Sequence, residues 1–416
     1  MKQKNTAEER ASRVCYETME AHARGCIQRW LQELLEAEVT EFLGRAKSQR
    51  RAEFEELSAG YRNGYGKPRK MALSSGTVTV CRPRIRNLEQ RFESRVLPLF
   101  KRRSNELSAM LPQLYLHGLA SGDFELALRG LLGEGAPLSA ASLMRLKTAW
   151  QAEYAVWKRA DLSQLELVYG WADGLYVKAG LSDRKAALLV FVGATSSGEK
   201  VLLGCAAGER ESKESWCELL RDLKQRGLKL PRLTVADGHL GIWAALGELH
   251  SHGAEQRCWN HKIVNVLNTL PKRDQFEAAK GLKAMMYANS RTACERKRDE
   301  FLLRFKKTDA KACATLTRDW ERLVSFFDYP KQHWIHLRTT NIVESPFNAV
   351  RLRTDASRRF KKVENAEAMI WKLLMVAQNS WRALNAPNLM RDVYHGKSFK
   401  DGVALECKTT PTRKAA

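Results

Sequence analysis

The sequence predicts a chain of several domains, one of which is an α/β domain with a mixed five-stranded sheet and helices, preceded by mainly helical domains. Two observations predict this. Between residues 161 and 267, runs rich in β-branched and aromatic residues alternate with amphipathic helical patterns. The full length of 416 residues exceeds what one hydrophobic core usually holds, and the hydrophobic content of 44% is enough to fill two or three cores.

The charge indicates a polyanionic partner. Lys and Arg total 70 against 47 Asp and Glu, a formal net charge of +23, so nucleic acid is the leading candidate. The longest apolar run, residues 186–194, is far shorter than the roughly 20 residues of a membrane helix, and the start MKQKNTAEER lacks the apolar core of a signal peptide. We therefore expect a cytoplasmic protein without a membrane partner, associated with the nucleoid when bound to DNA.

Two classes of bound group are not expected. The nine cysteines are scattered without a CxxC pair, which argues against a disulfide or zinc framework. No GxxxxGK[ST] or GxGxxG motif is present, so no nucleotide cofactor is expected.

The first region, residues 1–44, is expected to be helical and to serve packing or dimerisation. Thr6 and Glu9 form a capping-box pattern at its start. Apolar residues then recur at helical spacing. They include Ile27, Trp30, Leu31, Leu34 and Leu35.

Residues 45–103 form the most basic region and are a candidate for binding the DNA backbone. GYRNGYGK is expected to be a turn, and MALSSGTVTVCRPRIR a two-stranded hairpin about Ser75 and Gly76. Arg82, Arg84 and Arg86 would then share one face and contact DNA. A solvated surface hairpin is the alternative.

Residues 104–160 predict three helices separated by glycine-containing turns, the last opening at Ser139 after Pro137. This pattern suits a helix-turn-helix-like domain docked in a DNA major groove. A compact helical unit that binds no DNA is the alternative.

The segment 161–267 predicts the order βββαβα. LELVYGWADGLYVK is a strand carrying Asp173, and two strands follow around Ser196, Ser197 and Gly198. An amphipathic helix ended by Gly227 leads to the short strand PRLTVADG, which ends at Asp237, and to a second helix. This order is that of a ribonuclease-H-like core, in which the first and fourth strands are neighbours, so the two aspartates should meet.

Two adjacent carboxylates repel unless cations share the site. Oxygen ligands without thiolates favour Mg²⁺ or Mn²⁺, and two such ions can stabilise the attacking and leaving oxygens of a phosphodiester displacement. A third carboxylate, Glu344, is expected on a helix from about Asn341 that places Asn341, Glu344, Asn348 and Arg351 on one face. Arg351 and Arg353 could hold phosphates nearby.

Each acid has a structural alternative. Asp173-Gly174 and Asp237-Gly238 are turn dipeptides, and Glu344 lies three residues after Asn341 like a capping-box glutamate. The combination of a first-strand Asp, a fourth-strand Asp and a later helical Glu favours the metal site.

The chain resembles the bacterial insertion-sequence transposases related to the plant Mutator element, members of the Asp-Asp-Glu transposase superfamily, over nearly its whole length. The motifs that carry the resemblance are LLEAEVTEFLGR, GYRNGYGKPRK, LYLHGLASGDFELAL, WADGLYVK, VADGHLGIWAAL, QRCWNHKIVNVLNTLP, RTTNIVESPFNAVRLRT and RFKKVENAEAMIWKLL. The resemblance implies that Asp173, Asp237 and Glu344 are catalytic and bind two Mg²⁺ or Mn²⁺ ions.

The resemblance also completes the expected fold: an α/β catalytic domain of ribonuclease-H-like fold with an all-helical insertion, preceded by mainly helical DNA-binding domains. The insertion fits residues 268–330, the second part of the core residues 331–385, and a C-terminal tail residues 386–416. It places a Cys-x-x-His signature, Cys258 and His261, after the fifth strand.

Cys258 and His261 are only half of a zinc site, and no second pair lies at the expected separation. A structural role or a role in positioning a DNA strand is therefore preferred. His239 could contact a phosphate or orient a metal-bound water, although a surface histidine is the alternative.

The activity implied is DNA transposition. The protein would bind the terminal inverted repeats and target DNA as a homodimer or higher oligomer, and would cleave and transfer strands without a covalent enzyme intermediate. A catalytically silent DNA-binding regulator and a ribonuclease-H-like nuclease are the alternatives.

Overall fold

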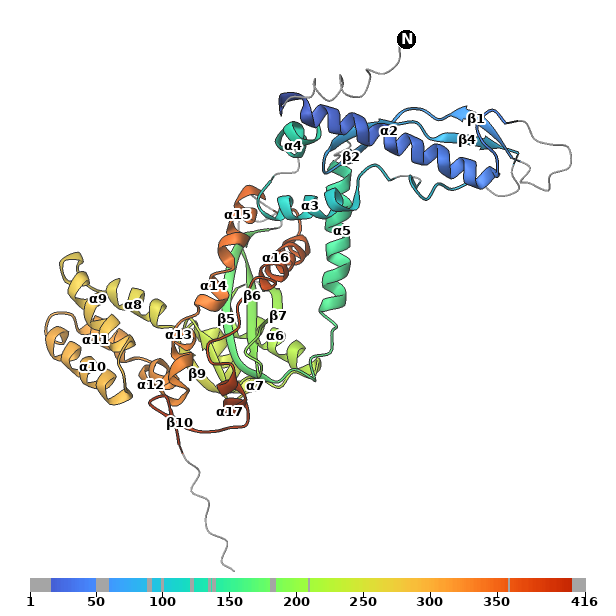
Figure 1. Cartoon of the computed structure of the whole chain (residues 1–416). Coiled ribbons are helices and arrows are strands. Elements are labelled where there is room, and N and C mark those ends of the chain that lie inside the picture. Colours follow the sequence, from blue (N-terminus) through green and yellow to red (C-terminus); the bar gives the residue numbers. More distant parts are fainter. Residues whose placement is uncertain are drawn as a thin grey trace, which may run out of the picture. The chain divides into compact units, whose positions relative to one another are not determined.

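The computed structural model describes residues 16–49, 60–87, 92–98, 101–119, 123–133, 136, 140–179, 185–208, 210–357 and 360–405 (Figure 1). The chain divides into two compact units, residues 1–146 and residues 147–416. Their boundary falls within helix α5 (Ala140–Trp157). Among the described residues no helix is both long and apolar enough to cross a membrane.

In the first unit, helix α2 (Tyr16–Leu43) packs against a hairpin of β2 (Arg69–Leu73) and β3 (Gly76–Val80). Leu35 of the expected apolar stripe is buried in a small core with Val80 and Leu97, whereas Trp30 is 57% exposed. The hairpin prediction is confirmed, but Leu73 pairs with Gly76, so the turn is one residue earlier than predicted. The expected capping pair, Thr6 and Glu9, lies outside the described residues.

The prediction that GYRNGYGK forms a turn is wrong. Tyr61–Tyr65 is strand β1, and it pairs antiparallel with β4 (Pro83–Arg86), with an irregularity between Arg62 and Tyr65. Gly64 within that irregularity has a φ of 62°, a conformation that glycine adopts without strain. Pairing with a strand further along the chain therefore overrides the local turn signal.

Three helices follow, as predicted: α3 (Asn105–Leu116), α4 (Phe124–Leu132) and α5. Helix α3 begins at Ser104, whose hydroxyl accepts a hydrogen bond from the backbone N–H of Leu107 at 3.2 Å. Ser139, the predicted start of the last helix, lies outside the described residues.

The second unit is built on a mixed five-stranded sheet with the order β7-β6-β5-β8-β9, which confirms the predicted sheet. Its strands are β5 (Leu167–Lys178), β6 (Lys185–Thr195), β7 (Lys200–Gly208), β8 (Leu233–Ala236) and β9 (Ala254–Arg257). Strand β6 runs antiparallel to its two neighbours, β5 and β7, and β8 and β9 run parallel to β5. The first and fourth strands are neighbours, as expected.

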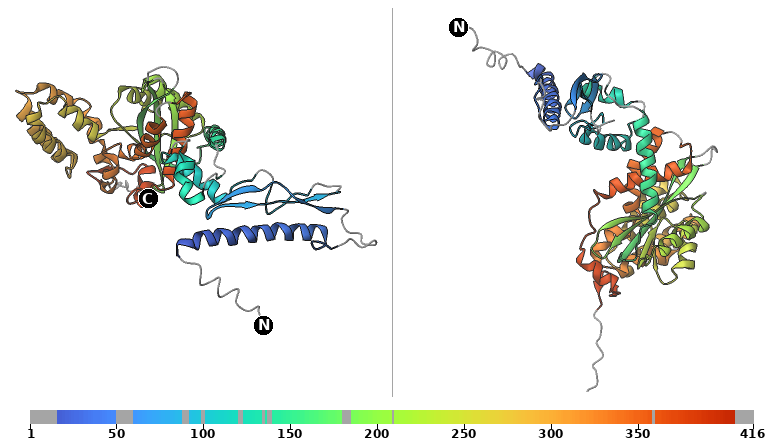
Figure 2. Two further views of the ribbon diagram at one scale, coloured as in Figure 1. Left: turned by 90° about the horizontal axis from the view of Figure 1, so that it is seen from above. Right: turned by 90° about the vertical axis from the view of Figure 1, so that its right-hand side faces the viewer.

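Helices cover both faces of this sheet (Figure 2). Helices α6 (Lys213–Gln225) and α7 (Leu240–Leu249) pack on one face through a continuous apolar core that includes Phe191, Trp216 and Ile242. Helix α16 (Val363–Gln378) lies along the edge strand β7. There Glu367 accepts a hydrogen bond from the backbone N–H of Ala207 at 2.5 Å, and Gln378 accepts one from Leu202 at 2.7 Å, so side chains of α16 satisfy this sheet edge.

Between β9 and the Glu344 segment the described chain is helical. The elements are α8 (Trp259–Leu267), α9 (Lys272–Met286), α10 (Arg291–Phe305), α11 (Ala310–Thr317), α12 (Trp320–Val324), η1 (Ser325–Asp328), η2 (Lys331–His333) and α13 (Trp334–Leu337). Gln256 and Trp259 both donate to the backbone oxygen of Leu323, at 3.1 and 2.8 Å. These buried bonds fasten the helical segment to the end of β9.

The predicted single helix from Asn341 is wrong, because the segment is two helices, α14 (Asn341–Glu344) and α15 (Phe347–Ser357). Pro346 separates them because it has no backbone N–H to continue the helical bonding. The chain ends, within the described residues, with α17 (Asn388–Tyr394), β10 (Phe399–Lys400) and β11 (Val403–Ala404).

Candidate active site

Asp173 and Asp237 lie at neighbouring positions on adjacent parallel strands. Ala172 of β5 pairs with Ala236 of β8, so the next residue on each strand is one of the two acids. Asp173 accepts a hydrogen bond from the backbone N–H of Gly174 at 2.9 Å, and Asp237 accepts one from His239 at 2.8 Å. The sheet thus brings together two carboxylates that are far apart in sequence, and the backbone fixes both.

Glycine follows each aspartate, and the structure requires it for a different physical reason at each position. Gly174 is in the middle of β5, not in a turn, and a Cβ there would lie 2.3 Å from the carboxyl carbon of Glu211. Gly238 has a φ of 99°, and a Cβ there would lie 2.4 Å from the Nε of Arg257. The turn alternative for Asp173-Gly174 is therefore excluded.

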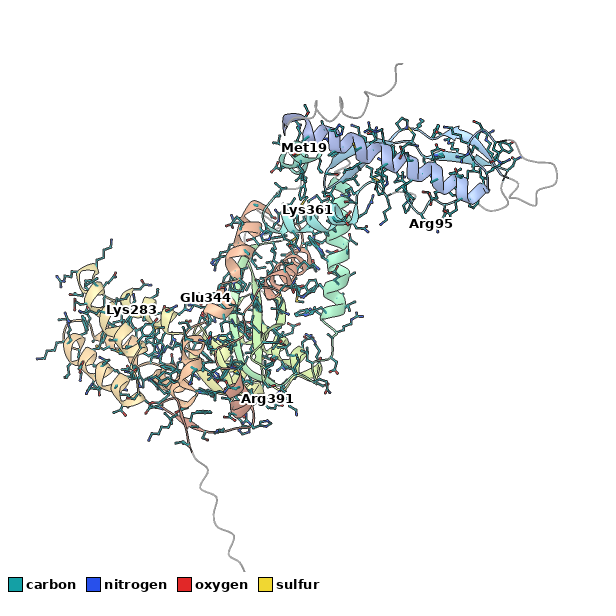
Figure 3. All side chains as sticks on the ribbon, viewed as in Figure 1. Met19, Arg95, Lys283, Glu344, Lys361 and Arg391 are labelled. Carbon is teal, nitrogen blue, oxygen red and sulfur yellow. The ribbon has the colours of Figure 1, made fainter. Side chains whose placement is uncertain are left out.

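Glu344 lies between β5 and α8 (Figure 3). Its Oε1 is 3.7 Å from the Nδ1 of His261 and accepts a hydrogen bond from the hydroxyl of Thr340. The backbone N–H of Thr340 in turn donates to the Sγ of Cys258 at 3.4 Å. Since Thr340, not Asn341, is the N-cap of α14, the capping box about Asn341, which was the structural alternative for Glu344, is not formed.

The charges of Glu344 and Asp237 act on two of their neighbours, Asp173 and His261. Burial, followed by the charges of Glu344 and Asp237, raises the pKa of Asp173 to about 7. A hydrogen bond with Cys258, together with the charges of Cys258, Glu344 and Asp237, raises the pKa of His261 to about 9. An anionic cluster of this kind favours binding of a cation.

Sequence reasoning missed a fourth acid, Glu211. Its side chain is buried behind Gly174, with 6% exposure, and it hydrogen-bonds with Tyr176. Burial and the charge of Asp237 raise its pKa. In the sequence it only precedes Ser212, the N-cap of α6, where a glutamate resembles any solvated loop residue, so no local signal reveals it.

Two of the residues predicted to contact DNA in this unit are buried. Cys258 is 0% and Arg353 is 3% exposed, which agrees with the structural alternative for Cys258, and contact of either residue with DNA stays a prediction. His239, Asn348 and Arg351 are exposed, and their contact with DNA stays a prediction.

In the first unit, the prediction that Arg82, Arg84 and Arg86 share one face holds for two of them. Arg84 and Arg86 are exposed on alternate positions of β4. Arg82 precedes the strand, is half-buried, and donates to the backbone oxygen of Phe92 at 3.2 Å. The pairing of β4 with β1 sets this arrangement.

Comparisons with known proteins agree on one family. Residues 1–383 match the model described as "Transposase, Mutator family". The chain is 43% identical to the transposase for insertion sequence element IS6120 of Mycolicibacterium smegmatis, over 74% of this chain and 95% of that protein. It is 39% identical to the transposase for insertion sequence element IST2 of Acidithiobacillus ferrooxidans, over 67% of this chain and 94% of that protein.

Among solved structures, the chain aligns with the Drosophila P element transposase strand transfer complex. The identity is 11%, the TM-score is 0.30, and the alignment covers 68% of this chain and 84% of that chain. This likeness is too weak to define the fold, which rests on the strand order given above.

Proposed function

The chain belongs to the Mutator family of transposases, and we propose that it is a DNA transposase whose catalytic carboxylates are Asp173, Asp237 and Glu344. It binds the terminal inverted repeats of an insertion sequence and catalyses metal-dependent strand cleavage and strand transfer. The observation that carries this proposal is the arrangement of the elements: β5 and β8 pair so that Asp173 and Asp237 follow neighbouring positions, and α14, which ends at Glu344, packs against β5. The charges of Glu344 and Asp237, after burial, also raise the pKa of Asp173, which agrees with this arrangement.

The donor set fits Mg²⁺ or Mn²⁺. All three side chains offer only oxygen atoms, which are the ligands that these hard cations prefer. A cation would also offset the burial and the repulsion by Glu344 and Asp237 that raise the pKa of Asp173. When bound, two such ions would stabilise the attacking and leaving oxygens of the phosphodiester displacement.

The protein's own groups position the reactants. Asp173 and Asp237 are fixed by the sheet and by backbone N–H groups. The exposed side chains of Asn348 and Arg351 follow Glu344 on α15 and are suited to hold phosphates. Water attacks the phosphodiester at the 3′ end of the element, and the freed 3′-OH then attacks a second strand, which requires no covalent enzyme intermediate.

The partner is double-stranded DNA, both the element ends and the target. Exposed arginines on β4, Arg84 and Arg86, add phosphate contacts in the first unit. Because two ends must be held together, the active assembly is at least a homodimer.

The test is strand cleavage by Asp237→Asn and Glu344→Gln on duplexes that carry the inverted repeats and on arbitrary duplexes. Loss of a metal ligand removes several kcal/mol of transition-state stabilisation, so cleavage should fall at least about 10²-fold. End binding should change by less than about twofold, since no phosphate contact is removed. Glu248→Gln, an exposed acid paired with Lys213 and Arg221, is the control and should cleave normally.

Undiminished cleavage by either variant would refute the assignment of that carboxylate. Equal cleavage of arbitrary duplexes by the unsubstituted protein would indicate a nuclease instead. Binding of the ends without any cleavage would indicate a silent regulator.

A further inference from the structure

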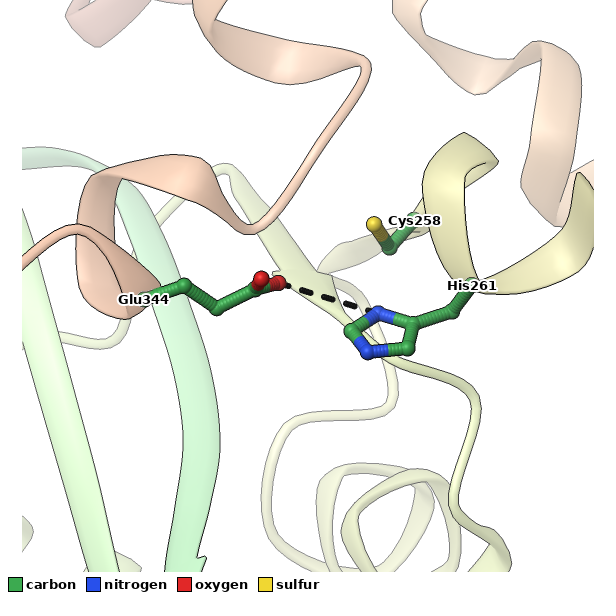
Figure 4. A group of neighbouring side chains, drawn as sticks. All are labelled: Cys258, His261 and Glu344. Atoms are coloured by element: carbon green, nitrogen blue, oxygen red, sulfur yellow. Dashed lines mark ion pairs between the residues drawn. The ribbon is translucent and has the colours of Figure 1, made fainter. Parts of the chain in front are cut away.

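Cys258, His261 and Glu344 form a cluster of three chemically different ligands (Figure 4). One donor atom from each, the sulfur, a ring nitrogen and a carboxylate oxygen, lies within 4.8 Å of the other two. Cys258 is the N-cap of α8, and His261 follows in the first turn of the same helix. The sequence offered only two of these ligands, and the fold supplies the third from α14.

The spacing is close to that of a tetrahedral metal site. With Zn–S near 2.3 Å and Zn–N or Zn–O near 2.0–2.2 Å, donor atoms around the ion lie about 3.3–3.7 Å apart. The Nδ1 of His261 and the Oε1 of Glu344 are already 3.7 Å apart. Their side chains are 39% and 31% exposed, so both have room to rotate toward the sulfur.

The sulfur itself is fixed. The backbone N–H of Cys258 donates to the oxygen of Ala236 at 2.8 Å, which continues the strand pairing. The backbone N–H of Thr340 donates to the sulfur at 3.4 Å. Outer contacts that orient a ligand in this way are usual around protein metal sites.

We propose that Cys258, His261 and Glu344 bind a thiophilic divalent ion such as Zn²⁺, with water as the fourth ligand, and that this ion inhibits cleavage by withdrawing Glu344 from Asp173 and Asp237. The inhibitory part rests on the proposed function, whereas the binding part does not. Thiolate and imidazole ligands favour Zn²⁺ over Mg²⁺, which prefers oxygen ligands only. The two kinds of ion therefore compete for one glutamate.

Binding is tested with Co²⁺ as a spectroscopic substitute for Zn²⁺ on the full chain, reduced and stripped of metal by a chelator. We expect a near-ultraviolet charge-transfer band from sulfur to cobalt and visible bands of tetrahedral cobalt. Zn²⁺ should abolish both bands. Mg²⁺, which competes only for Glu344, should raise the Co²⁺ concentration that is needed but should not remove the sulfur-to-cobalt band at saturating Co²⁺. Cys258→Ser should lose the charge-transfer band.

Cys26→Ser is the matched control. Cys26 is an exposed cysteine whose sulfur is 3.5 Å from the Nε2 of His22, another Cys–His pair on a helix. This variant should keep the band. Absence of the band in the unsubstituted protein, or its survival in Cys258→Ser, would overturn the site.

Because Cys258 is fully buried, its substitution could prevent folding, so His261→Asn provides a second measurement at a partly exposed position. Loss of an outer contact of a metal ligand already costs about 10–100-fold in affinity, so loss of His261 itself should weaken Co²⁺ binding at least about 100-fold. Unchanged affinity in a folded His261→Asn protein would also overturn the site.

Inhibition is tested by adding Zn²⁺ to cleavage reactions at constant Mg²⁺, with each protein compared with its own zinc-free rate. The unsubstituted protein should be half-inhibited near the Zn²⁺ concentration that half-displaces Co²⁺. His261→Asn should need at least about 100-fold more Zn²⁺. Binding without inhibition would refute the withdrawal of Glu344, and absence of any cleavage would refute the proposed function while the cobalt measurement still decides the metal site.

Discussion

Replacing Asp173 by Asn should abolish cleavage and yet stabilise the metal-free protein at neutral pH. Asn keeps the oxygen that accepts the N–H of Gly174 and has nearly the same volume, so packing is preserved. What it removes is a half-buried negative charge beside two others, Glu344 and Asp237. If Asp173 served to stabilise the fold, its replacement by Asn would instead lower the stability of the protein.

The magnitude follows from the pKa. One pKa unit corresponds to about 1.4 kcal/mol, so a pKa of about 7 in place of the ordinary 3.8 corresponds to an upper limit of roughly 4 kcal/mol. The folded carboxyl holds its proton to higher pH than the unfolded one. The carboxyl of Asp173 therefore does not lower the free energy of unfolding below pH 3.8. Its destabilising effect grows as the pH rises toward 7 and is largest above pH 7.

The assay is thermal unfolding of the full chain, with chelator present, from about pH 5 to about pH 8.5. At the upper end Asp173→Asn should raise the Tm by up to about 10 °C, and at the lower end by much less. Mg²⁺ should then raise the Tm of the unsubstituted protein more than that of the variant, because the variant has lost a ligand. Asp392→Asn is the control and should show little change, because the side chain of Asp392 is 40% exposed and pairs with Lys397 at 3.0 Å.

A variant that is less stable than the unsubstituted protein at high pH would refute the reasoning. So would a stabilisation that is the same at every pH, since the effect would then not come from the charge.

Three further predictions concern packing and DNA contact. Gly174→Ala should lower the free energy of unfolding in urea by about 1–3 kcal/mol, because its methyl would lie 2.3 Å from the buried carboxyl carbon of Glu211. Gly247→Ala in α7, where a methyl meets nothing within 4 Å, should raise it by about 0.5–1 kcal/mol. Equal effects of the two substitutions would contradict the close packing at Gly174. End binding should weaken roughly 10³-fold between 50 and 200 mM salt if about six phosphates are contacted, and Arg84→Ala should lower the salt slope by about 1; an unchanged slope would remove Arg84 from the interface. Tyr169→Phe deletes the hydroxyl that hydrogen-bonds with the buried Nδ1 of His333 at 2.8 Å. It should lower the free energy of unfolding by about 1–3 kcal/mol, and an unchanged urea midpoint would contradict this prediction.

The sheet was predictable because its signals are local and strong. The β5 run is rich in β-branched and aromatic residues over twelve positions, and α6 places Trp216, Leu220 and Leu223 on one helical face. The order of these strands and helices along the chain predicts a topology in which the first and fourth strands, β5 and β8, are neighbours. That pairing brings Asp173 and Asp237 side by side.

What could not be predicted depends on contacts between distant segments. The glycines and asparagine of β1 indicate a turn until β4 supplies a pairing strand. Glu211 looks like a loop acid, and only the absence of a side chain at Gly174 lets it reach the site. Likewise the backbone N–H that donates to the sulfur of Cys258 belongs to Thr340, which lies in another part of the sequence.

Glu344 is the adjustable member of the three carboxylates. Asp173 and Asp237 are fixed on the sheet by backbone bonds, whereas Glu344 is held by the hydroxyl of Thr340 and by a partly exposed His261. A hydrogen bond to a charged group contributes roughly 1.5–3 kcal/mol and an exposed ion pair about 0–1 kcal/mol. Under the two proposals above, a bound cation would compete with both contacts for this carboxylate. The ion that binds would then decide the direction in which Glu344 points, while Asp173 and Asp237 keep their places on the sheet.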